Sequence, residues 1–451
     1  MKENPNPVIK RVLVVGAMKL AAPALIGQTE NMETDRDVAV NKDGFPYLPG
    51  TTLAGILRGT LAAAEANLLF GWAEKQEATQ SPLWVYDSAL LFKKDADPAD
   101  GKADPANVIT IDGVSLDENQ RNAETPKQPE LDHMNKAAKD QAKFDFQAVD
   151  KGSVFDLRLS LTIRRNDRDL ESLLTKVLAR LNSLYVGGKT SRGFGKLVCE
   201  KIYRRDFDFT GADKVEQLNA WLEFSEWATL KTERFEQRDI EFKQPENISV
   251  LTAELELDGS VLIRDVYSIE EDEDHAHTRS KSDGKSVIYG TSWAGAIRGG
   301  LAKLLKTNRR ANAEAYLDEV FGKQYFDGKK NVTTPSKVRL DASYLSGGDR
   351  IKYSRVKIDR FTGGAANTAL FTNRPHFGGG CRLSVQFAQT DAAVKELFLL
   401  ALDAIDKGLI TLGGETAVGR GKFKVKSVQI DGEEVEYKQA KPRLKEAMEN
   451  V

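Results

Sequence analysis

The sequence predicts an α+β protein in which one domain is written twice, and two repeated segments carry this prediction. Residues 50–59 (GTTLAGILRG) recur as residues 290–299 (GTSWAGAIRG), with six of ten positions identical. A glycine-rich segment at residues 187–196 recurs at residues 413–422. Two landmarks that follow each other in the same order at similar spacing indicate an internal duplication.

The first half contains alternating strand and helix patterns. β-Branched, apolar runs predict the strands, and apolar residues at helical spacing predict the helices, the first of which ends at Gly71. We expect strand, helix, strand, strand, helix and strand at residues 8–17, 50–69, 84–92, 154–163, 170–184 and 197–203. The polar segment 93–143 is a long insertion, and such long loops inside a domain more often have a function than not.

The second half repeats this order after a charged connector with a helical segment at residues 215–230. We expect its elements at residues 248–257, 290–305, 338–344, 381–387, 394–405 and 423–430. The order β-α-β-β-α-β is that of a ferredoxin-like (RRM-like) fold. The predicted domains are therefore residues 1–203 and 247–437, with the connector at 204–246 and a tail at 438–451.

The composition is that of an ordinary globular protein, with 41% hydrophobic and 29% charged residues among 451. No apolar run approaches the roughly 20 residues that cross a bilayer, and the N-terminus lacks a signal-peptide core. We therefore expect a cytoplasmic protein without a membrane partner. Cys199 and Cys381 are too few for a disulfide framework or a cysteine-rich zinc site. A net charge of −2 gives no global indication of nucleic-acid binding.

The glycine-rich loops combine backbone N–H groups, hydroxyls and cations, which suit phosphate oxygens. They are not Walker loops, because the required spacing and the following helix are absent, and they are not dinucleotide fingerprints. A tight turn between helix and strand is the alternative interpretation. The Gly-Thr helix starts are a second candidate anion site. Arg58 and Arg298 could reach a phosphate there or could be ordinary surface arginines.

The glycine pattern Gly-Gly-x4-Gly-x-Gly, paired with a Pro-Gly-Thr-x3-Gly-x2-Arg helix start, resembles the RAMP superfamily of CRISPR effector subunits. Residues 355–371 (RVKIDRFTGGAANTALF) look like the β-hairpin thumb of the type III backbone group. The equivalent region of the first half, residues 131–146, is degenerate. A single chain with two such domains is similar to the tandem backbone subunits of type III-D systems.

This resemblance implies that the chain holds CRISPR guide RNA beside other effector subunits, both backbone subunits and a large polymerase-like subunit. It further implies that an Asp before the Gly-Thr helix cleaves the paired single-stranded target RNA with a divalent metal, Mg²⁺ or Mn²⁺. Asp37, six residues before Asp43, fits that catalytic and metal-binding position, and Asp35 is the second choice. A solvated loop acid is the alternative for Asp37.

The second half departs from this pattern, because His277 stands opposite Asp37 when the two helix starts are aligned. Asp274 and His275 lie just upstream. Asp274 could supply the chemistry, the histidines could take part as acid or base, or this half could be a scaffold.

The resemblance and the charges together name candidates for RNA binding. They are Arg58, Lys189, Thr190, Arg192, Arg298, Arg355, Lys357, Arg360, Arg420 and Lys422. Phe361, Phe371 and Phe194 could stack on bases, although core packing is the better expectation for the last two. An RNA-guided endoribonuclease subunit is the leading hypothesis. A non-catalytic RNA-holding module and a ribonuclease that processes precursor guide RNA are the alternatives.

Overall fold

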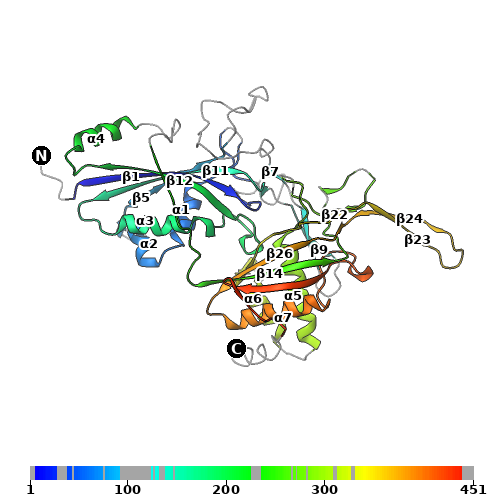
Figure 1. Cartoon of the computed structure of the whole chain (residues 1–451). Coiled ribbons are helices and arrows are strands. Elements are labelled where there is room, and N and C mark those ends of the chain that lie inside the picture. The colour runs from blue at the N-terminus through cyan, green and yellow to red at the C-terminus, as the bar shows by residue number, and fades with distance from the viewer. Residues whose placement is uncertain are drawn as a thin grey trace, which may run out of the picture. The chain divides into compact units, whose positions relative to one another are not determined.

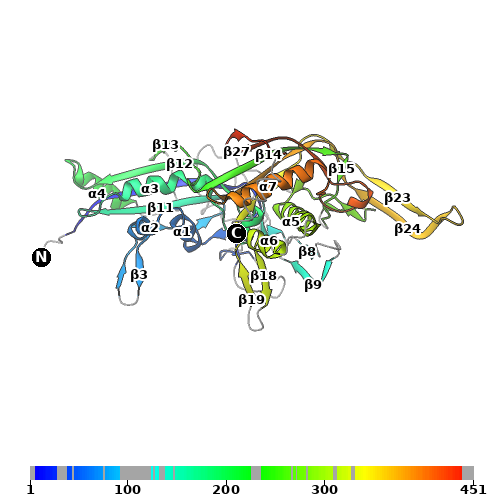
Figure 2. The same cartoon turned by 90° about the horizontal axis from the view of Figure 1, so that it is seen from below.

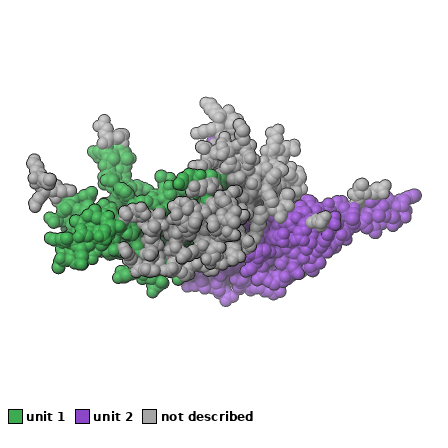
Figure 3. All heavy atoms as spheres, turned by 90° about the horizontal axis from the view of Figure 1, so that it is seen from above, with its two compact units in different colours: residues 1–126, 145–188, 195–245 green, residues 127–144, 189–194, 246–451 purple. Residues whose placement is uncertain are grey.

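The protein divides into two compact units, which are described separately (Figure 3). The computed structural model describes residues 6–27, 38–42, 45–74, 77–91, 123–124, 127–131, 138–145, 148–224, 235–265, 268–270, 272–280, 283–307, 312–326 and 331–438. Unit 1 contains residues 1–126, 145–188 and 195–245, and unit 2 contains residues 127–144, 189–194 and 246–451. None of the helices formed by the described residues has the length and apolar character that a membrane crossing requires.

Unit 1 is built on one antiparallel sheet. In spatial order its strands are β13 (Glu236–Arg238), β12 (Leu197–Asp208), β1 (Val8–Leu20), β11 (Val154–Arg164) and β5 (Leu83–Val85). Its helices are α1 (Gly50–Arg58), α2 (Ala63–Phe70), α3 (Leu170–Ala179) and α4 (Lys214–Glu223), with the 3₁₀ turn η3 (Leu181–Ser183) after α3. Figure 1 shows α1, α2 and α3 on one side of this sheet and α4 on the other.

Strand β1 is buried on both faces. Alternate side chains of a strand point to opposite sides, and here they enter two different cores. Val12 and Val14 join the core under α1, α2 and α3, whereas Leu13 and Val15 join the core that includes Phe207. Trp221 and Phe224 of the α4 segment pack against that second core. The apolar run at the start of the chain therefore indicates a central strand covered on both sides.

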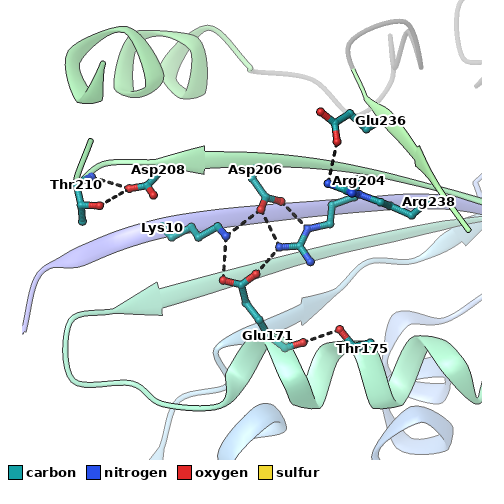
Figure 4. A network of polar contacts seen from close by, with 9 residues as sticks. All are labelled: Lys10, Glu171, Thr175, Arg204, Asp206, Asp208, Thr210, Glu236 and Arg238. Atoms are coloured by element: carbon teal, nitrogen blue, oxygen red, sulfur yellow. Dashed lines mark hydrogen bonds and ion pairs between the residues drawn. The ribbon is translucent and has the colours of Figure 1, made fainter. Parts of the chain in front are cut away.

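A cluster of four charged side chains fastens α3 to the sheet (Figure 4). Lys10 Nζ lies 2.9 Å from both Glu171 Oε1 and Asp206 Oδ2. Arg204 donates to Glu171 and to Asp206. Burial alone would raise the pKa of Glu171 and of Asp206, but hydrogen bonds from the two cations outweigh it and hold both below their usual values. The cluster is most favourable where both carboxylates are ionised.

Unit 2 repeats the arrangement with its own antiparallel sheet. In spatial order its strands are β20 (Val338–Leu340), β26 (Gly380–Ala388), β14 (Ile248–Asp258), β27 (Lys422–Ile430) and β28 (Glu433–Glu434). Helices α5 (Gly290–Thr307), α6 (Ala313–Phe321) and α7 (Ala392–Asp406) cover one face of it (Figure 1). Trp293 anchors α5, since its ring lies 5.5 Å from that of Phe423 and its Nε1 donates to Ser343.

Short strand pairs surround both sheets and include equivalent pairs in the two units. They are β2 (Tyr47–Leu48) with β6 (Ser88–Ala89), β17 (Val287–Ile288) with β21 (Ser343–Tyr344), β3 (Trp72–Glu74) with β4 (Glu77–Thr79), and β18 (Lys323–Phe326) with β19 (Asn331–Thr334). Two further pairs are β7 (Ala123–Glu124) with β10 (Ala148–Val149) and β8 (Lys127–Leu131) with β9 (Ala138–Asp145), and a small sheet contains β15 (Ser260–Val261), β25 (His376–Phe377) and β22 (Asp349–Arg350).

The predicted hairpin of the second half is present. Strands β23 (Tyr353–Ile358) and β24 (Ala365–Arg374) are antiparallel, and β16 (His275–Ala276) joins β24 in parallel. Figure 2 shows β23 and β24 extending away from the helices and the sheet of unit 2. In and beside the degenerate region of the first half, β8 and β9 form a two-stranded sheet, and residues 127–144 are grouped with unit 2.

Several predicted elements differ from the structure. The helix expected at 50–69 is two helices, because the backbone N–H and the hydroxyl of Thr60 both bond to the carbonyl of Leu57 and close α1. The strand expected at 84–92 is divided into β5 and β6, and the strand expected at 338–344 is divided into β20 and β21. The segment expected as a connector belongs to unit 1: β12 continues to Asp208, and β13 pairs with Ile202–Arg204 of that strand.

Candidate nucleic-acid interface

The two glycine-rich loops have the same backbone conformation. Each contains one 3₁₀ turn, η4 (Thr190–Arg192) or η8 (Thr416–Val418). A residue in the left-handed region precedes each turn, Lys189 at φ 55° and Glu415 at φ 56°. The repeat therefore extends from sequence to backbone geometry, and it places a cation and an anion at equivalent positions.

Glycine is required at the close of each loop. A Cβ on Gly195 would lie 1.8 Å from the carbonyl oxygen of Val186, and a Cβ on Gly421 would lie 1.8 Å from that of Leu412. The same two glycines donate to the carbonyls of Pro23 and Ser260 at 2.7 Å. These glycines thus form a tight turn between helix and strand, as the alternative interpretation predicts.

The first loop contributes an exposed Lys189 and a half-buried Thr190. Arg192 is held inward, because its Nη2 donates to the carbonyl of Phe321 at 2.8 Å. Burial, together with the neighbouring Arg298, lowers the pKa of Arg192. Phe194 is 2% exposed and stacks on Tyr289, which confirms that it is a core residue.

The second loop is tied to the base of the β23–β24 hairpin. Glu415 accepts hydrogen bonds from Arg355, Asn373 and Arg420. Arg420 is only 6% exposed. The structure therefore places this RNA-binding candidate inside a polar cluster, whereas Lys422 at the start of β27 is exposed.

The repeated arginines join two helices in each unit. Arg58 Nη1 donates to the carbonyl of Gly71 at 2.7 Å, and its Nη2 donates to Asn67. Arg298 forms the equivalent ion pair with Asp318. Both arginines, predicted as phosphate ligands, stabilise the helix pair that follows the Gly-Thr element.

The start of α1 is already occupied by a carboxylate. Asp87 Oδ1 accepts from the N–H of Gly50 at 2.6 Å, and the carbonyl of Asp87 accepts from Arg158. Arg158 also forms an ion pair with Asp156, which is 1% exposed. Because a carboxylate satisfies and screens this helix end, it is a poor phosphate site, contrary to expectation.

The hairpin presents cations and an aromatic ring to solvent. Asp359 Oδ1 accepts from the backbone N–H groups of Phe361 and Thr362 at 3.0 and 2.7 Å and so fixes the tip. Phe361 is 98% exposed, and Lys357 and Arg360 are exposed beside it. Such an exposed aromatic ring among cations is the composition of a single-stranded nucleic-acid platform.

Further apolar side chains of the hairpin are exposed. Val356 pairs across the strands with Leu370, and the two are 46% and 64% exposed. Phe371 is 49% exposed, so the expectation that it belongs to the core is wrong. Its strand position opposite Arg355 places it beside the base of the hairpin rather than within either core.

The acid and histidines of the second half lie along β16 and β24. Asp274 is exposed, and its Oδ2 accepts from the N–H of Thr372 at 2.7 Å. His275 is half-buried, and burial, followed by the charge of Arg264, lowers its pKa although Asp274 and Glu415 oppose this. Asp274 and His275 remain accessible to a ligand.

His277 has a different environment from its two neighbours. It has no exposed surface, its Nδ1 accepts from the N–H of Ile263, and burial followed by the charge of His376 lowers its pKa to about 3. The neutral ring is therefore a core residue and does not face solvent.

Asp35, Asp37 and Asp43 lie outside the described residues. Among the residues that the structure describes, no group of three or more His, Cys, Asp or Glu side chains is close enough to hold a metal ion. Asp274 can offer a single carboxylate, and Mg²⁺ accepts such a site because it retains several waters.

The sequence interpretation overlooked Glu415, Asn373 and Asp87. A usable signal was available for Glu415, since the aligned glycine loops contain Lys189 and Glu415 at the same place. A change of sign at one position of a repeat indicates a change of partner. Asp87 and Asn373 are single polar residues, and only the tertiary structure brings them to their partners.

The family comparison agrees with the duplication. The model of the RAMP superfamily matches residues 18–198 and 254–424, which are one stretch in each half of the sequence and together most of the chain. No curated protein sequence matches the chain.

Proposed function

This chain belongs to the RAMP superfamily, and we propose that it is a CRISPR RNA-binding backbone subunit of a type III effector complex. Proteins of this superfamily are CRISPR-associated and bind RNA. The tandem arrangement favours the form similar to type III-D subunits. Its partners would be guide RNA, the paired target RNA and the other effector subunits.

We assign each unit to the ferredoxin-like fold. The first, second, third and fourth strands of unit 1 are β1, β5, β11 and β12, and their spatial order is fourth, first, third, second. Unit 2 has the same order with β14, β20, β26 and β27. This shared order, with α1, α2 and α3 or α5, α6 and α7 on one face of the sheet, supports the assignment.

The exposed β23–β24 hairpin carries the proposal of RNA binding. Phe361 at the tip is 98% exposed, and stacking of a base on such a ring contributes about 1–3 kcal/mol. Lys357 and Arg360 supply cations for phosphates without reading sequence. This arrangement favours a backbone role over processing of precursor guide RNA.

The test of RNA binding uses the purified full-length protein. We expect bound RNA, seen as a high 260/280 nm absorbance ratio that falls after a high-salt wash. Phe361→Ala should retain less RNA than the wild type, whereas Leu409→Ala, at another exposed apolar side chain of unit 2, should retain as much. Equal RNA content in all three proteins would argue against the hairpin.

We further propose that the first half cleaves the target RNA through Asp37. A divalent ion, Mg²⁺ or Mn²⁺, held by this carboxylate would stabilise charge on the scissile phosphate. Asp37 precedes α1 in the sequence, and Asp87 and Arg158 fix the start of that helix.

Asp37→Ala should abolish one target cleavage and leave guide RNA bound. A denaturing gel of labelled target RNA, with and without Mg²⁺, checks this, and Asp35→Ala is the matched control. Unchanged fragments in Asp37→Ala would contradict the assignment, and loss of cleavage in Asp35→Ala alone would transfer the role to that neighbour.

For unit 2 we propose a second candidate function. This unit either contains a weaker catalytic site or binds RNA without cleaving it. Asp274 is bonded to the backbone of β24, and His277 is buried. These two observations favour RNA binding over RNA cleavage in unit 2. Asp274→Ala should therefore leave the number of target fragments unchanged.

A further inference from the structure

A polar cluster joins the second glycine-rich loop to the base of the β23–β24 hairpin. Glu415 Oε1 accepts from Arg355 and, at 2.8 Å, from Asn373 Nδ2. Glu415 Oε2 accepts from Arg420 Nε at 2.7 Å. Arg420 in turn donates to Ser260 Oγ at 2.5 Å. These five residues, which we call the Glu415 cluster, come from four segments of unit 2, namely β15, β23, β24 and the second glycine-rich loop.

Burial makes the Glu415 cluster energetically significant. The side chains of Glu415 and Arg420 are 12% and 7% exposed, and that of Arg355 is 32% exposed. The guanidinium of Arg420 also lies 5.1 Å from the centre of the Tyr353 ring and 5.7 Å from that of Phe377. Shielded charge-assisted bonds of this kind are stronger than neutral ones.

The equivalent position of the first loop has the opposite charge. Lys189 and Glu415 share one backbone conformation and both precede a 3₁₀ turn. Lys189 is exposed, so the first loop presents a cation to solvent. Glu415 instead presents a carboxylate, which repels phosphate and attracts the guanidinium groups beside it.

The Glu415 cluster connects both strands of the hairpin to the second glycine-rich loop. Arg355 belongs to β23 and Asn373 to β24, so Glu415 bonds to both strands of the hairpin at once. The loop itself is fastened to the sheet, since Gly414 donates to the carbonyl of Leu262 at 2.8 Å and Gly421 donates to that of Ser260. A rigid loop is therefore connected to both strands of a protruding element by one side chain.

We propose that Glu415 is a positioning residue that locks the β23–β24 hairpin onto the second glycine-rich loop. That loop then serves as the anchor of the hairpin instead of as a phosphate cradle. The anchoring itself is independent of RNA. Its consequence, that the tip meets RNA in a fixed orientation, rests on the proposed function.

The test uses the full-length, RNA-free protein with a spin label at Ala365→Cys on the exposed side of β24. Both native cysteines are buried, so a thiol-reactive nitroxide labels the new site. In the Glu415→Gln variant we expect narrower spectral lines and amide exchange about tenfold faster in β23 and β24, because charge-assisted bonds are lost. Unchanged line shape and exchange would overturn the proposal.

A matched control is Glu256→Gln. Glu256 belongs to the same unit and forms an ion pair with Lys426, but the pair is exposed and lies on the sheet instead of the hairpin. It should leave the spectrum and the exchange of the hairpin unchanged. Equal loosening in both variants would mean that the effect is general destabilisation, which would also overturn the proposal.

Two further measurements separate anchoring from other roles. Arg355→Gln should loosen the hairpin as Glu415→Gln does, and the double variant should add little, because the two side chains share one interaction. Additive effects would contradict the coupling. If Glu415→Gln or Glu415→Lys instead tightens binding of a single-stranded RNA without loosening the hairpin, the loop is a phosphate site and the anchor is overturned.

The result for anchoring is distinguishable from the result for the proposed function. Absence of RNA binding in the wild type would contradict the RNA-binding proposal and leave the mobility measurement intact. An unaltered hairpin in Glu415→Gln would contradict the anchor even if RNA binds normally.

Discussion

Asp156 has an environment that is unusual for a carboxylate. It lies in β11 with 1% of its surface exposed, accepts from the N–H of Ala89 and pairs with Arg158. Burial raises its pKa to about 6, although Arg158 and the backbone bond oppose this. The residue supports the turn between β5 and β6, which in turn holds the start of α1.

The pH dependence of stability follows from this raised pKa. Between the ordinary value near 4 and the folded value, the folded state binds more protons than the unfolded state, so ionising Asp156 destabilises the fold as pH rises. Asp156→Asn removes this contribution. The free energy of unfolding of the variant relative to the wild type should increase by up to about 3 kcal/mol between pH 4 and pH 7.

Urea titrations at several pH values measure this difference. The cluster of Lys10, Glu171, Arg204 and Asp206 works in the opposite sense, since its carboxylates have lowered pKa values and lose their contribution as pH falls. Glu171→Gln is therefore the control, and its difference from the wild type should shrink at acid pH. A pH-independent difference for Asp156→Asn would contradict the account.

At the scale of the element, the conformation of the second glycine-rich loop depends on backbone geometry more than on side chains. Gly421 has φ 75°, and a Cβ there would lie 1.8 Å from the carbonyl oxygen of Leu412. Gly421→Ala should lower the free energy of unfolding of unit 2 by about 3 kcal/mol or more, because strain and backbone overlap combine. Thermal or urea unfolding, followed by circular dichroism, measures the change.

Gly295→Ala is the matched control for Gly421→Ala. Gly295 is inside helix α5, where an added Cβ meets nothing within 4 Å. Alanine is preferred over glycine in a helix, so this substitution should stabilise unit 2 by roughly 0.5–1 kcal/mol. Similar losses in both variants would mean that the loop geometry is not the cause.

Elements with a dense local pattern could be predicted from the sequence. The repeated Gly-Thr helix, the closing glycines and the hairpin at residues 355–371 all appear where expected. The break between α1 and α2 was missed, because apolar spacing continues through Thr60 and only its bond to Leu57 ends the helix. Phe371 was misplaced because a strand pattern does not say whether a face is covered.

Site residues were harder to predict than elements because charge alone does not identify a partner. Arg58, Arg298 and Arg420 carry the positive charge expected of phosphate ligands, yet each bonds to groups of the protein itself. The partners, such as Asp318 and Glu415, lie 20 and 5 residues away from their arginines. Lys357 and Arg360 of the hairpin remain exposed candidates for RNA.

At the scale of the whole molecule, the two units share a strand order, and the two halves of the sequence share a glycine-rich loop that differs in charge and attachments. The first loop exposes Lys189, and the second uses Glu415 to hold a hairpin with an exposed tip. A duplicated framework of this kind can keep its folding pattern while each copy takes a separate part in one function. Substitutions in the β23–β24 hairpin therefore give the most direct test of RNA binding.

The salt dependence of RNA binding tests this central claim most directly. Each phosphate contact that is removed lowers the slope of log affinity against log salt by roughly 0.7–1. For Lys357→Gln combined with Arg360→Gln, we predict a slope lower by about 1.5–2 than that of the wild type. Lys214→Gln with Lys407→Gln, which makes the same charge change on helix-associated residues outside the hairpin, should keep the wild-type slope. Equal slopes for the wild type and the hairpin variant, measured with one single-stranded RNA, would contradict RNA binding by the hairpin.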